Sequence, residues 1–480
     1  MESSSLPAAA KKKIIELVGP RGFLDRPEDL SLYEYDGSVD KARPELVVFP
    51  RSTEEVSAIV KITSQHGIPI VGRGAGTGLS GGAIPRSGGV IIGFSRMNRI
   101  LEIDIENERA VLQPGVVNLD ITLAVQASGY FYAPDPSSQR ACTIGGNVAE
   151  NSGGPHTLAY GVTTNHVLAL EFVMPDGTIH TTGSKAQDSP GYDLTGLLTG
   201  SEGTMVLVTK IIVRLMRQPE KVKTLLAVYN SASDAADTVA EITACAITPV
   251  AVEMLDGEML RMVELATHAG YPMDAAAVLL IELEGLVEAV EEQSEQIRAV
   301  CERCGAREFR IAKSAEEREL LWKGRKNAFG AVGRVSSSYY VQDGVVPRTQ
   351  VAPTLRYIAE VATRHNLRIS NIFHAGDGNL HPIILFNARI PEELERAKNA
   401  GEDILRYCIS VGGSITGEHG VGMEKNELMD RLFSPDSLAC IGRFKSLFDP
   451  AGLLNPGKVL PTGRGCLEIR QAPLTRRNTV

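Results

Sequence analysis

Gly72-Arg-Gly-Ala-Gly-Thr-Gly-Leu-Ser-Gly-Gly82 is the stretch of sequence that decides the fold of the first half of this chain. Six of its eleven residues are glycine, so the backbone can approach a ligand closely and turn its N–H groups toward an anion. Arg73, Thr77 and Ser80 supply side-chain donors in the same stretch. The stretch therefore predicts a loop that cradles a phosphate, and a flexible glycine-rich loop is the alternative.

The formal G-x-G-x-x-G at residues 76–81 does not indicate a Rossmann fold. That fold requires a helix directly after the motif. Here residues 83–89 contain Pro85 and two adjacent glycines, and an apolar strand at residues 90–94 comes next. The stretch also lacks the Gly-Lys-Ser/Thr of a P-loop. We therefore expect a different arrangement of strands and helices around the loop.

The segments that flank the glycine loop alternate between strand and helix patterns. Ser52, with Glu55 three residues later, forms a capping box that opens a helix to about residue 65. An amphipathic pattern that ends at Gly129 predicts a second helix at residues 118–128. The expected strands are residues 44–50, 68–71, 90–94, 100–104, 110–113, 167–173 and 178–181.

Two further runs of small residues follow the glycine loop. One covers residues 134–154, and the other is Gly200-Ser-Glu-Gly-Thr204. Small residues let a backbone lie directly against a ligand. Three such loops in one α+β half predict one long ligand that is held along its length.

A second motif, His374-Ala-Gly-Asp-Gly-Asn-Leu-His381, lies in the C-terminal half, and Gly417-Glu-His-Gly420 follows it. The Asp377-Gly378 pair predicts a two-residue hairpin turn, which would place residue 374 opposite 381 and residue 376 opposite 379. Two facing imidazoles and the carboxylate of Glu418 would form an open metal site. His419 would face a substrate as a general base. Ordinary polar residues near a turn are the alternative.

Length and composition bound the class of protein. With 480 residues, we expect about three domains. A hydrophobic content of 43% with 22% charged residues is typical of a globular protein. The net charge of −9 argues against nucleic acid or an anionic membrane as a main partner. No apolar run of about 20 residues predicts a membrane span, and the N-terminus lacks the apolar region of a signal peptide.

Seven cysteines indicate reduced thiols and a cytoplasmic location. Cys301 and Cys304 form a lone C-x-x-C, whereas an iron–sulfur cluster needs about four ligands. We therefore expect this pair to lie on a helix without a metal. Any cluster that the chemistry requires would lie on another subunit.

The C-terminal half predicts a second α+β unit. Residues 217–223 resemble a linker, and alternating patterns follow it. Residues from about 411 onward would return to close the cleft, and the Asn455-Pro-Gly sequence would end that return. The expected elements are residues 232–244, 277–283, 287–304, 351–365 and 435–448.

Together these motifs resemble the FAD-linked oxidases of the vanillyl-alcohol-oxidase type, over residues 40–460. Residues 322–334, 373–379, 417–422 and 454–458 are similar to the branch that contains bacterial glycolate oxidase D subunits and D-2-hydroxy-acid dehydrogenases. The resemblance implies an α+β fold: a two-subdomain FAD-binding domain, a substrate (cap) domain and a C-terminal helical return. The implied boundaries are 1–220, 221–410 and 411–465, with a flexible tail at 466–480.

The resemblance also implies which residues hold FAD. The first loop has no histidine, so we expect non-covalent FAD, with Cys142 as a packed residue. Val206 departs from the glycine that relatives have at this position, which puts cofactor affinity in question. The implied residues are Arg73, Gly74, Ala75, Gly76, Thr77, Gly78, Ser80, Gly81, Pro134, Asp135, Ser138, Thr143, Gly145, Gly146, Asn147, Asn151, Ser152, Gly153, Gly154, Glu202, Gly203 and Asn455.

For the substrate, the resemblance implies oxidation of a D-2-hydroxy acid, with a hydride passing to the flavin. The metal, zinc or manganese, would be held by His374, His381 and Glu418, and His419 would take the hydroxyl proton. Arg325 matches the arginine that binds a carboxylate in related 2-hydroxyglutarate dehydrogenases, and a solvated helix arginine is the alternative. The matching far wall is apolar and consists of Phe329, Val341 and Ile383, so we expect a small monocarboxylate, glycolate or D-lactate.

Three roles stay open at this stage. The chain would be the flavin subunit of a complex, with a second flavin-domain subunit and an iron–sulfur subunit that passes electrons to quinone. Alternatively, it would be a stand-alone D-lactate dehydrogenase or a non-catalytic flavin-binding subunit. A complex with a membrane quinone would place the chain peripherally at the inner membrane through its partners.

Overall fold

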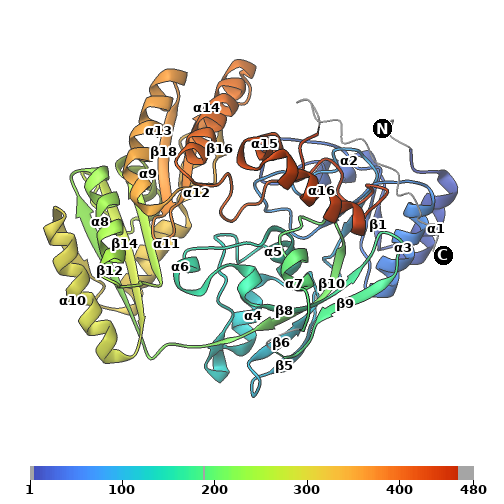
Figure 1. The fold of residues 1–480 in the computed structure, drawn as a ribbon, viewed down its shortest axis with the longest axis horizontal. Coiled ribbons are helices and arrows are strands. Elements are labelled where there is room, and N and C mark those ends of the chain that lie inside the picture. Colours follow the sequence, from blue (N-terminus) through green and yellow to red (C-terminus); the bar gives the residue numbers. More distant parts are fainter. Residues whose placement is uncertain (1–4, 187–189, 463–480) are drawn as a thin grey trace, which may run out of the picture.

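The computed structural model describes residues 5–186 and 190–462, and it divides into an N-terminal half and a C-terminal half (Figure 1). Figure 1 shows the green and yellow elements of the C-terminal half at one side and the blue and cyan elements at the other. The predicted tail at 466–480 lies outside the described residues. Within the described ranges, no helix combines the length and apolarity that a membrane span requires.

The first sheet has the order β1-β2-β4-β3, and β2, β4 and β3 run parallel. The glycine loop begins at the end of β3, where parallel strands direct their carboxyl ends to one edge. Ser52 caps the following helix α3 by accepting the N–H of Glu55, as predicted. The elements are β1 (Phe23–Leu24), β2 (Leu46–Val48), β3 (Ile70–Arg73), β4 (Val90–Gly93), α1 (Ala8–Val18), α2 (Pro27–Leu30) and α3 (Thr53–Gln65).

The second sheet is antiparallel, with the order β5-β6-β10-β8-β9. Helices α4 and α5 bury Ile121, Val125, Ile144 and Val148 in its core. The elements are β5 (Ile100–Asp104), β6 (Arg109–Leu112), β8 (Val167–Val173), β9 (Ile179–Gly183), β10 (Leu207–Arg214), α4 (Asn118–Val125), α5 (Ile144–Glu150), α6 (Thr157–Tyr160) and α7 (Leu194–Leu198), with a small β7 (Tyr130–Phe131) and β11 (Met216–Arg217) pair.

The C-terminal half is built on an eight-stranded antiparallel sheet with the order β15-β12-β14-β13-β18-β19-β16, to which β17 adds at β19. Its strands are β12 (Lys221–Tyr229), β13 (Ala251–Asp256), β14 (Ala277–Gly285), β15 (Ala306–Ile311), β16 (Ser338–Val341), β17 (Gly344–Val345), β18 (Arg368–His374) and β19 (Asn379–Phe386). Alternate residues of each strand enter two different cores, so helices cover both faces.

One core contains α8 (Ala232–Ala244), α10 (Val287–Arg303), α13 (Val351–His365) and α14 (Pro391–Ser410). The other contains α9 (Gly257–Thr267), α11 (Ala315–Lys326) and α12 (Ala328–Val332). From α11 and α12, Arg325, Lys326 and Phe329 reach the cavity that the C-terminal half shares with the N-terminal half. Cys301 and Cys304 lie at the end of α10 and form no disulfide.

The last described segment returns to the N-terminal half through α15 (Met429–Leu432) and α16 (Pro435–Phe448), which Figure 1 draws in red beside the blue and green elements. Leu454 pairs with Ile70 of β3, and the N–H of Asn455 donates to the Ile70 carbonyl at 2.8 Å. Residues nearly four hundred positions apart therefore form one layer.

Most of the expected elements are present, but some bounds were wrong. The predicted helices 232–244, 351–365 and 435–448 coincide with α8, α13 and α16. Residues 144–150 form helix α5, although this run of small residues read as a loop. The predicted strand 44–50 is only β2, because prolines at both ends lack the N–H that a strand interior needs. The patterns also missed α1, α9 and α14.

Candidate active site

A single cavity of about 510 Å³ runs from the glycine loop to the histidine motif. It joins the three small-residue loops of the N-terminal half to α11 and β19 of the C-terminal half. Fourteen of the residues predicted to hold a ligand line it: Arg73, Gly74, Ala75, Gly76, Thr77, Gly78, Ser138, Thr143, Gly145, Gly146, Asn147, Ser152, Glu202 and Gly203. One long ligand can therefore lie along these loops with one end at the histidines.

The glycines of this wall leave room for a bound group. A Cβ added at Gly78 or Gly203 would meet no atom within 4 Å. At Gly76, φ is +70°, and a Cβ would lie 2.2 Å from the Arg73 guanidinium. The backbone thus has open space beside it at Gly78 and Gly203, whereas the Arg73 side chain lies directly against Gly76. This surface suits the close backbone approach that a dinucleotide pyrophosphate needs.

Arg73 supports the loop from within. Its side chain is 6% exposed, and Nη2 donates to the Tyr35 carbonyl at 2.7 Å. The guanidinium also lies 5.4 Å from the centre of the Tyr33 ring. These contacts fix the loop conformation while Arg73 still borders the cavity.

The other eight predicted ligand-binding residues lie behind the cavity wall or beside it, not on it: Ser80, Gly81, Pro134, Asp135, Asn151, Gly153, Gly154 and Asn455. Ser80 is fully buried, and its carbonyl accepts the N–H of Met423 at 3.0 Å. Asn455 donates to the carbonyls of Gly82 at 2.8 Å and Glu202 at 2.7 Å, and so joins two of the loops. These residues brace the wall.

Cys142 and Val206, the two positions that bear on how FAD is bound, are buried in the cavity wall. The Asn147 amide donates to the Cys142 sulfur at 3.5 Å, and burial raises the pKa of that thiol. Cys142 therefore lies in the wall as a packed, protonated side chain. Val206 is 2% exposed, lines the cavity and packs in the core of the second sheet.

The predicted register of the histidine hairpin was wrong. His374 pairs with Asn379, and His381 pairs with Ile372, so the two histidines are diagonal neighbours and not opposite. The turn has four residues in place of two, because Val346 donates to the Gly378 carbonyl and extends the loop. A shift by two positions keeps both side chains on one face of the sheet. The ring centres are consequently 5.0 Å apart.

His374 and His381 direct one nitrogen each at the same carboxylate oxygen. His374 Nε2 and His381 Nε2 both lie 3.2 Å from Oε1 of Glu418. The Nδ1 atom of each ring has its own hydrogen-bond partner. His374 Nδ1 lies 2.8 Å from Glu253, and His381 Nδ1 lies 3.2 Å from the Gln342 carbonyl. When Nδ1 of His381 carries the proton and donates it to the Gln342 carbonyl, Nε2 presents a lone pair. This Nε2 is buried and has no hydrogen-bond partner.

This arrangement matches the requirements of a divalent metal. The three ligand atoms of His374, His381 and Glu418 lie within 4.8 Å of one another. Metal-bound histidines characteristically donate their other N–H to a carboxylate or a carbonyl, as Glu253 and Gln342 accept here. Burial alone would raise the pKa of the Glu418 carboxyl, but the facing histidines hold that pKa well below its usual range. The donor set of two nitrogens and one oxygen fits zinc or manganese.

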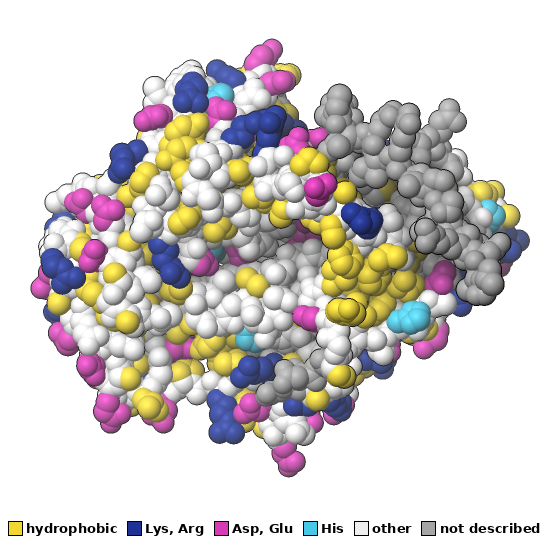
Figure 2. Space-filling model, viewed as in Figure 1, with side chains coloured by type: hydrophobic (Ala, Val, Ile, Leu, Met, Phe, Trp, Pro, Cys, Tyr) yellow, Lys and Arg dark blue, Asp and Glu magenta, His cyan; other side chains and the backbone are white. Residues whose placement is uncertain are grey.

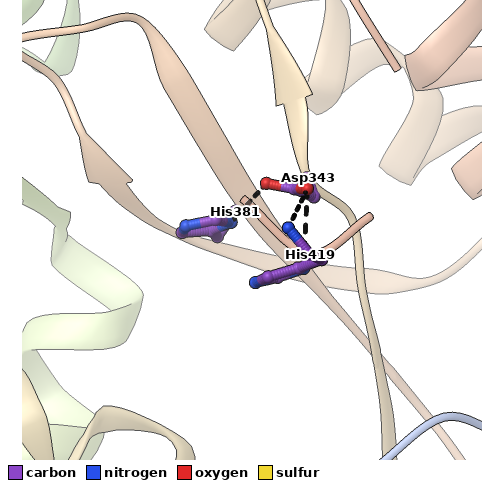
Figure 3. A group of neighbouring side chains, drawn as sticks. All are labelled: Asp343, His381 and His419. Carbon is purple, nitrogen blue, oxygen red and sulfur yellow. Dashed lines mark hydrogen bonds and ion pairs between the residues drawn. The ribbon is translucent and has the colours of Figure 1, made fainter. Parts of the chain in front are cut away.

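Asp343 organises the loop that carries Glu418 and His419 (Figure 3). Its carboxylate accepts the N–H groups of Gly417 at 3.0 Å and His419 at 2.8 Å, and the Thr416 hydroxyl at 2.6 Å. Asp343, His381 and His419 could also hold an ion by spacing alone. Because these donors occupy Oδ2 of Asp343 and the Asn379 amide donates to Oδ1 at 3.0 Å, we assign Asp343 to the support of the loop.

His419 is positioned between the loop and the cavity. Its ring stacks on His381 with a centre distance of 4.9 Å and an angle of 10°. Its Nε2 is 3.8 Å from Glu418 Oε1, and the residue lines the cavity. Burial lowers the pKa of His419 to about 4, despite the opposing effect of Asp343. The imidazole is therefore neutral near pH 7 and can accept a proton.

Arg325 is a buried cation at the cavity and not a solvated helix residue. Only 2% of its surface is exposed. Its Nε donates to Glu253, and its Nη2 lies 3.4 Å from His374 Nδ1. The carboxylate of Glu253 thus orients both the guanidinium and the imidazole. Arg325 also borders the cavity, where a bound carboxylate would meet it.

The predicted far wall is correct only in part. Phe329 lines the cavity, but Val341 and Ile383 are a cross-strand pair buried in the core beneath α11 and α12. They share a strand face with the cavity residues Tyr339 and His381, but α11 and α12 cover them there. Tyr339 takes their place and stacks on Phe329 with a ring distance of 6.2 Å. The wall remains largely aromatic.

The sequence patterns missed three supporting residues: Glu253, Gln342 and Asp343. Glu253 lies in the middle of the apolar strand β13, and Gln342-Asp343 follows directly on β16. A carboxylate inside an apolar strand must have a buried partner, and this is the signal that could have revealed Glu253. Gln342 acts through its backbone carbonyl, for which side-chain patterns give no signal.

Comparisons with known proteins identify the family of the chain. Residues 44–183 match the model of an FAD binding domain, and residues 218–459 match that of the FAD linked oxidases, C-terminal domain. The chain is 47% identical over 448 residues to the glycolate oxidase subunit GlcD of Escherichia coli (strain K12), covering 93% of this chain and 90% of that protein.

Two further similarities extend the comparison. The chain is 33% identical to a D-lactate dehydrogenase of Anaerostipes hadrus, covering 87% of this chain and 90% of that protein. The structure of p-cresol methylhydroxylase with bound substrate superimposes with a TM-score of 0.81 at 20% identity, covering 95% of this chain and 98% of that one. That likeness supports the fold alone.

The fold and the cavity define an FAD-dependent oxidoreductase with an α+β architecture. The chain belongs to the FAD-linked oxidases of the vanillyl-alcohol-oxidase type, in the group that contains glycolate oxidase GlcD subunits and D-lactate dehydrogenases.

Proposed function

We propose that this protein oxidises glycolate or D-lactate to the 2-oxo acid. The observation that carries the proposal is the convergence of His374, His381, Glu418 and His419 with Arg325 at one end of the FAD cavity. A 2-hydroxy acid needs a partner for its carboxylate, activation of its hydroxyl and an acceptor for its hydride. The relatives named as a glycolate oxidase subunit and a D-lactate dehydrogenase support the choice of substrate.

The three small-residue loops would hold FAD without a covalent bond. The open backbone at Gly78 and Gly203 suits the pyrophosphate and the flavin, and Cys142 is occupied by Asn147. When bound, FAD supplies the acceptor for the hydride from the substrate Cα. We propose that residues 1–220 hold this FAD and that residues 221–410 and 411–465 close the cavity.

His374, His381 and Glu418 would hold a divalent metal, zinc or manganese. The unpaired, buried Nε2 of His381 supports this assignment, because a lone pair facing a carboxylate is costly without a cation. A metal ion bound there would lower the pKa of the substrate hydroxyl. Glu253 and the Gln342 carbonyl fix the tautomers of the two histidines.

His419 and Arg325 would act directly on the substrate. Arg325 would bind the carboxylate through the N–H donors that Glu253 leaves free. His419 Nε2 would accept the hydroxyl proton, and its depressed pKa keeps the ring neutral and ready to accept. The two residues approach the cavity from α11 and the 416–420 loop, so the substrate would lie between them.

The aromatic pair Phe329 and Tyr339 supports a small monocarboxylate as substrate. A second carboxylate against these rings would lose its hydration without a charged partner, at a cost of several kcal/mol. A dicarboxylate is therefore expected to be a poor substrate.

We also infer that the chain is the flavin subunit of a larger complex. The relative from Escherichia coli is named as a subunit, and within the described residues no group of cysteines has metal-binding geometry. A second flavin-domain subunit and an iron–sulfur subunit would carry electrons to quinone. A stand-alone D-lactate dehydrogenase is the second candidate, favoured by the 33% identity to such an enzyme.

Anaerobic titration of the purified protein with glycolate and with D-lactate tests the proposed function. Bleaching of the flavin absorbance by either acid supports the proposal. A flavin spectrum that is unchanged by both acids, in protein that contains a full complement of metal, contradicts it. If the flavin of the isolated protein is bleached by the acid but turnover is then slow, the result would favour a role as subunit of a complex over a role as stand-alone enzyme.

A further inference from the structure

His156 joins the two halves of the molecule at a site that the proposed chemistry does not use. Its Nδ1 lies 2.9 Å from the Asp135 carboxylate in the N-terminal half. Its Nε2 lies 3.3 Å from the Glu282 carboxylate on β14 of the C-terminal half. The imidazole therefore bridges two carboxylates, one from each half of the molecule.

The Glu282 carboxylate is a buried junction. Its side chain is 1% exposed, and it accepts hydrogen bonds from Arg318 at 2.8 and 3.0 Å. It also accepts the indole N–H of Trp322 and the hydroxyl of Thr224, at 2.5 and 2.6 Å. Two of these donors, Arg318 and Trp322, belong to α11. Glu282 consequently anchors that helix to the sheet.

His156 bears a positive charge in this setting. Each ring nitrogen faces a carboxylate oxygen, so both nitrogens serve as donors. Burial alone would lower the pKa of the imidazole, but Asp135 and Glu282 outweigh it and raise that pKa to about 10. The His156 ring also packs on Trp322, with ring centres 5.4 Å apart. The charge of His156 and the packing of its ring thus both act on helix α11.

Both ends of this network lead to the cavity. Asp135 immediately precedes Pro136, Ser137 and Ser138, which line the cavity at the second loop. On α11, Arg325 lies three residues beyond Trp322, which places it on the same helix face one turn later. Lys326, which also lines the cavity, lies 3.7 Å from Asp135.

We propose that His156 is a positioning residue that fixes the distance between the flavin loop at Asp135 and the substrate-binding Arg325 on α11. The role of Arg325 in this inference rests on the proposed function. His156 itself touches neither cavity nor metal ligands. It acts by holding two rigid elements in register, and a misplacement of about 1 Å can cost about 10²-fold in rate.

The test compares H156Q with two related variants and one matched control. H156R restores a cation that can bridge both carboxylates, and W322F removes one donor of the same junction. The control is H365Q, because His365 also pairs with a carboxylate, Asp403, at 2.8 Å and is 17% exposed against 18% for His156. His365 lies on α13, on the other face of the eight-stranded sheet.

The first readout is the rate of flavin bleaching in single turnovers at saturating glycolate or D-lactate, in FAD-loaded protein. H156Q is expected to bleach about 10- to 100-fold more slowly, W322F to fall between H156Q and wild type, and H365Q to match wild type. H156R is expected to recover most of the lost rate. FAD-loaded H156Q and W322F that both bleach at the wild-type rate would overturn the proposal.

The second readout is amide hydrogen exchange of residues 315–326, which needs no substrate. H156Q is expected to accelerate exchange there, and H365Q is expected to leave it unchanged. If wild type is not bleached by either acid, the proposed function fails, and the exchange result alone decides whether His156 holds α11. Unchanged exchange in H156Q would then reject the positional role.

Discussion

Asp343 and His419 are joined through the backbone: Asp343 Oδ2 accepts the N–H of His419 at 2.8 Å, while the ring Nδ1 of His419 lies 3.9 Å from the same oxygen. The adjacent N–H groups of Gly417 and Glu418 point to the same carboxylate, at 3.0 and 3.2 Å. One buried anion thereby fixes the backbone that carries both a metal ligand and the general base.

Replacing Asp343 with asparagine is expected to disturb this loop strongly. The new amide group would face backbone N–H donors and would leave Lys425, 3.7 Å away, without its anion. We expect a loss of about 3 kcal/mol in the free energy of unfolding, measured by urea denaturation. The control is D403N, since Asp403 is 34% exposed, and its loss should be below about 1 kcal/mol. A D343N protein as stable as D403N would contradict this role.

Removal of the metal is expected to separate flavin binding from catalysis. The loops at Gly78 and Gly203 are distinct from His374, His381 and Glu418, so chelated protein should retain its flavin absorbance. Reduction by substrate should slow by about 10²-fold, because metal activation of the hydroxyl contributes several kcal/mol. Zinc or manganese should restore the rate. Metal-free protein, verified by elemental analysis, that bleaches at the original rate would disprove the metal assignment.

The bridge at His156 predicts a specific pH dependence of stability. The pKa of its imidazole is about 10 when folded, against an ordinary value of 6.5. A raised pKa stabilises the fold fully below pH 6.5, and this contribution is lost as the pH rises toward 10. The charged groups around the ring are Asp135 and Glu282 and, further out, Glu284, Arg318 and Lys326.

Urea denaturation of wild type and H156Q at pH 6, 8 and 10 measures this dependence. The difference in the free energy of unfolding should be largest at pH 6 and smallest at pH 10. A difference that stays constant over this range would show that folding does not raise the pKa of the imidazole.

The aromatic wall predicts a change of specificity. Substitution of Phe329 with threonine makes that wall smaller and more polar, so D-malate, a dicarboxylate, should gain at least about 10-fold in kcat/KM relative to D-lactate. V341T is the matched control, because Val341 lies in the core and not at the cavity. That variant should lose stability without a change in preference. Wild type that prefers D-malate would contradict the monocarboxylate assignment.

Sequence patterns predicted the parts of this molecule that depend on local chemistry. The glycine loop, the Ser52 cap and the helices at 232–244 and 351–365 follow from turn residues, caps and apolar periodicity. The three proposed metal ligands converge as expected, although the hairpin register was wrong by two positions. The correct face survived because a strand alternates with a period of two.

The missing parts depend on tertiary contacts. The turn of the histidine hairpin has four residues because Arg348 and Val346 bind its carbonyls, and both lie outside the hairpin. Val341 and Ile383 were expected to face the substrate, but α11 and α12 pack over them and bury them in the core. Glu253 and Asp343 act on residues 72 to 121 positions away, and single-sequence patterns do not show such partners.

The most direct test of the account is an anaerobic visible spectrum of the purified, metal-loaded protein, recorded before and after addition of glycolate and then D-lactate. We expect a flavin spectrum that bleaches with at least one of the two acids and stays unchanged when His419 is replaced by glutamine. A protein without a flavin spectrum, or a full flavin spectrum that neither acid bleaches, would contradict the proposed oxidation of a small 2-hydroxy acid.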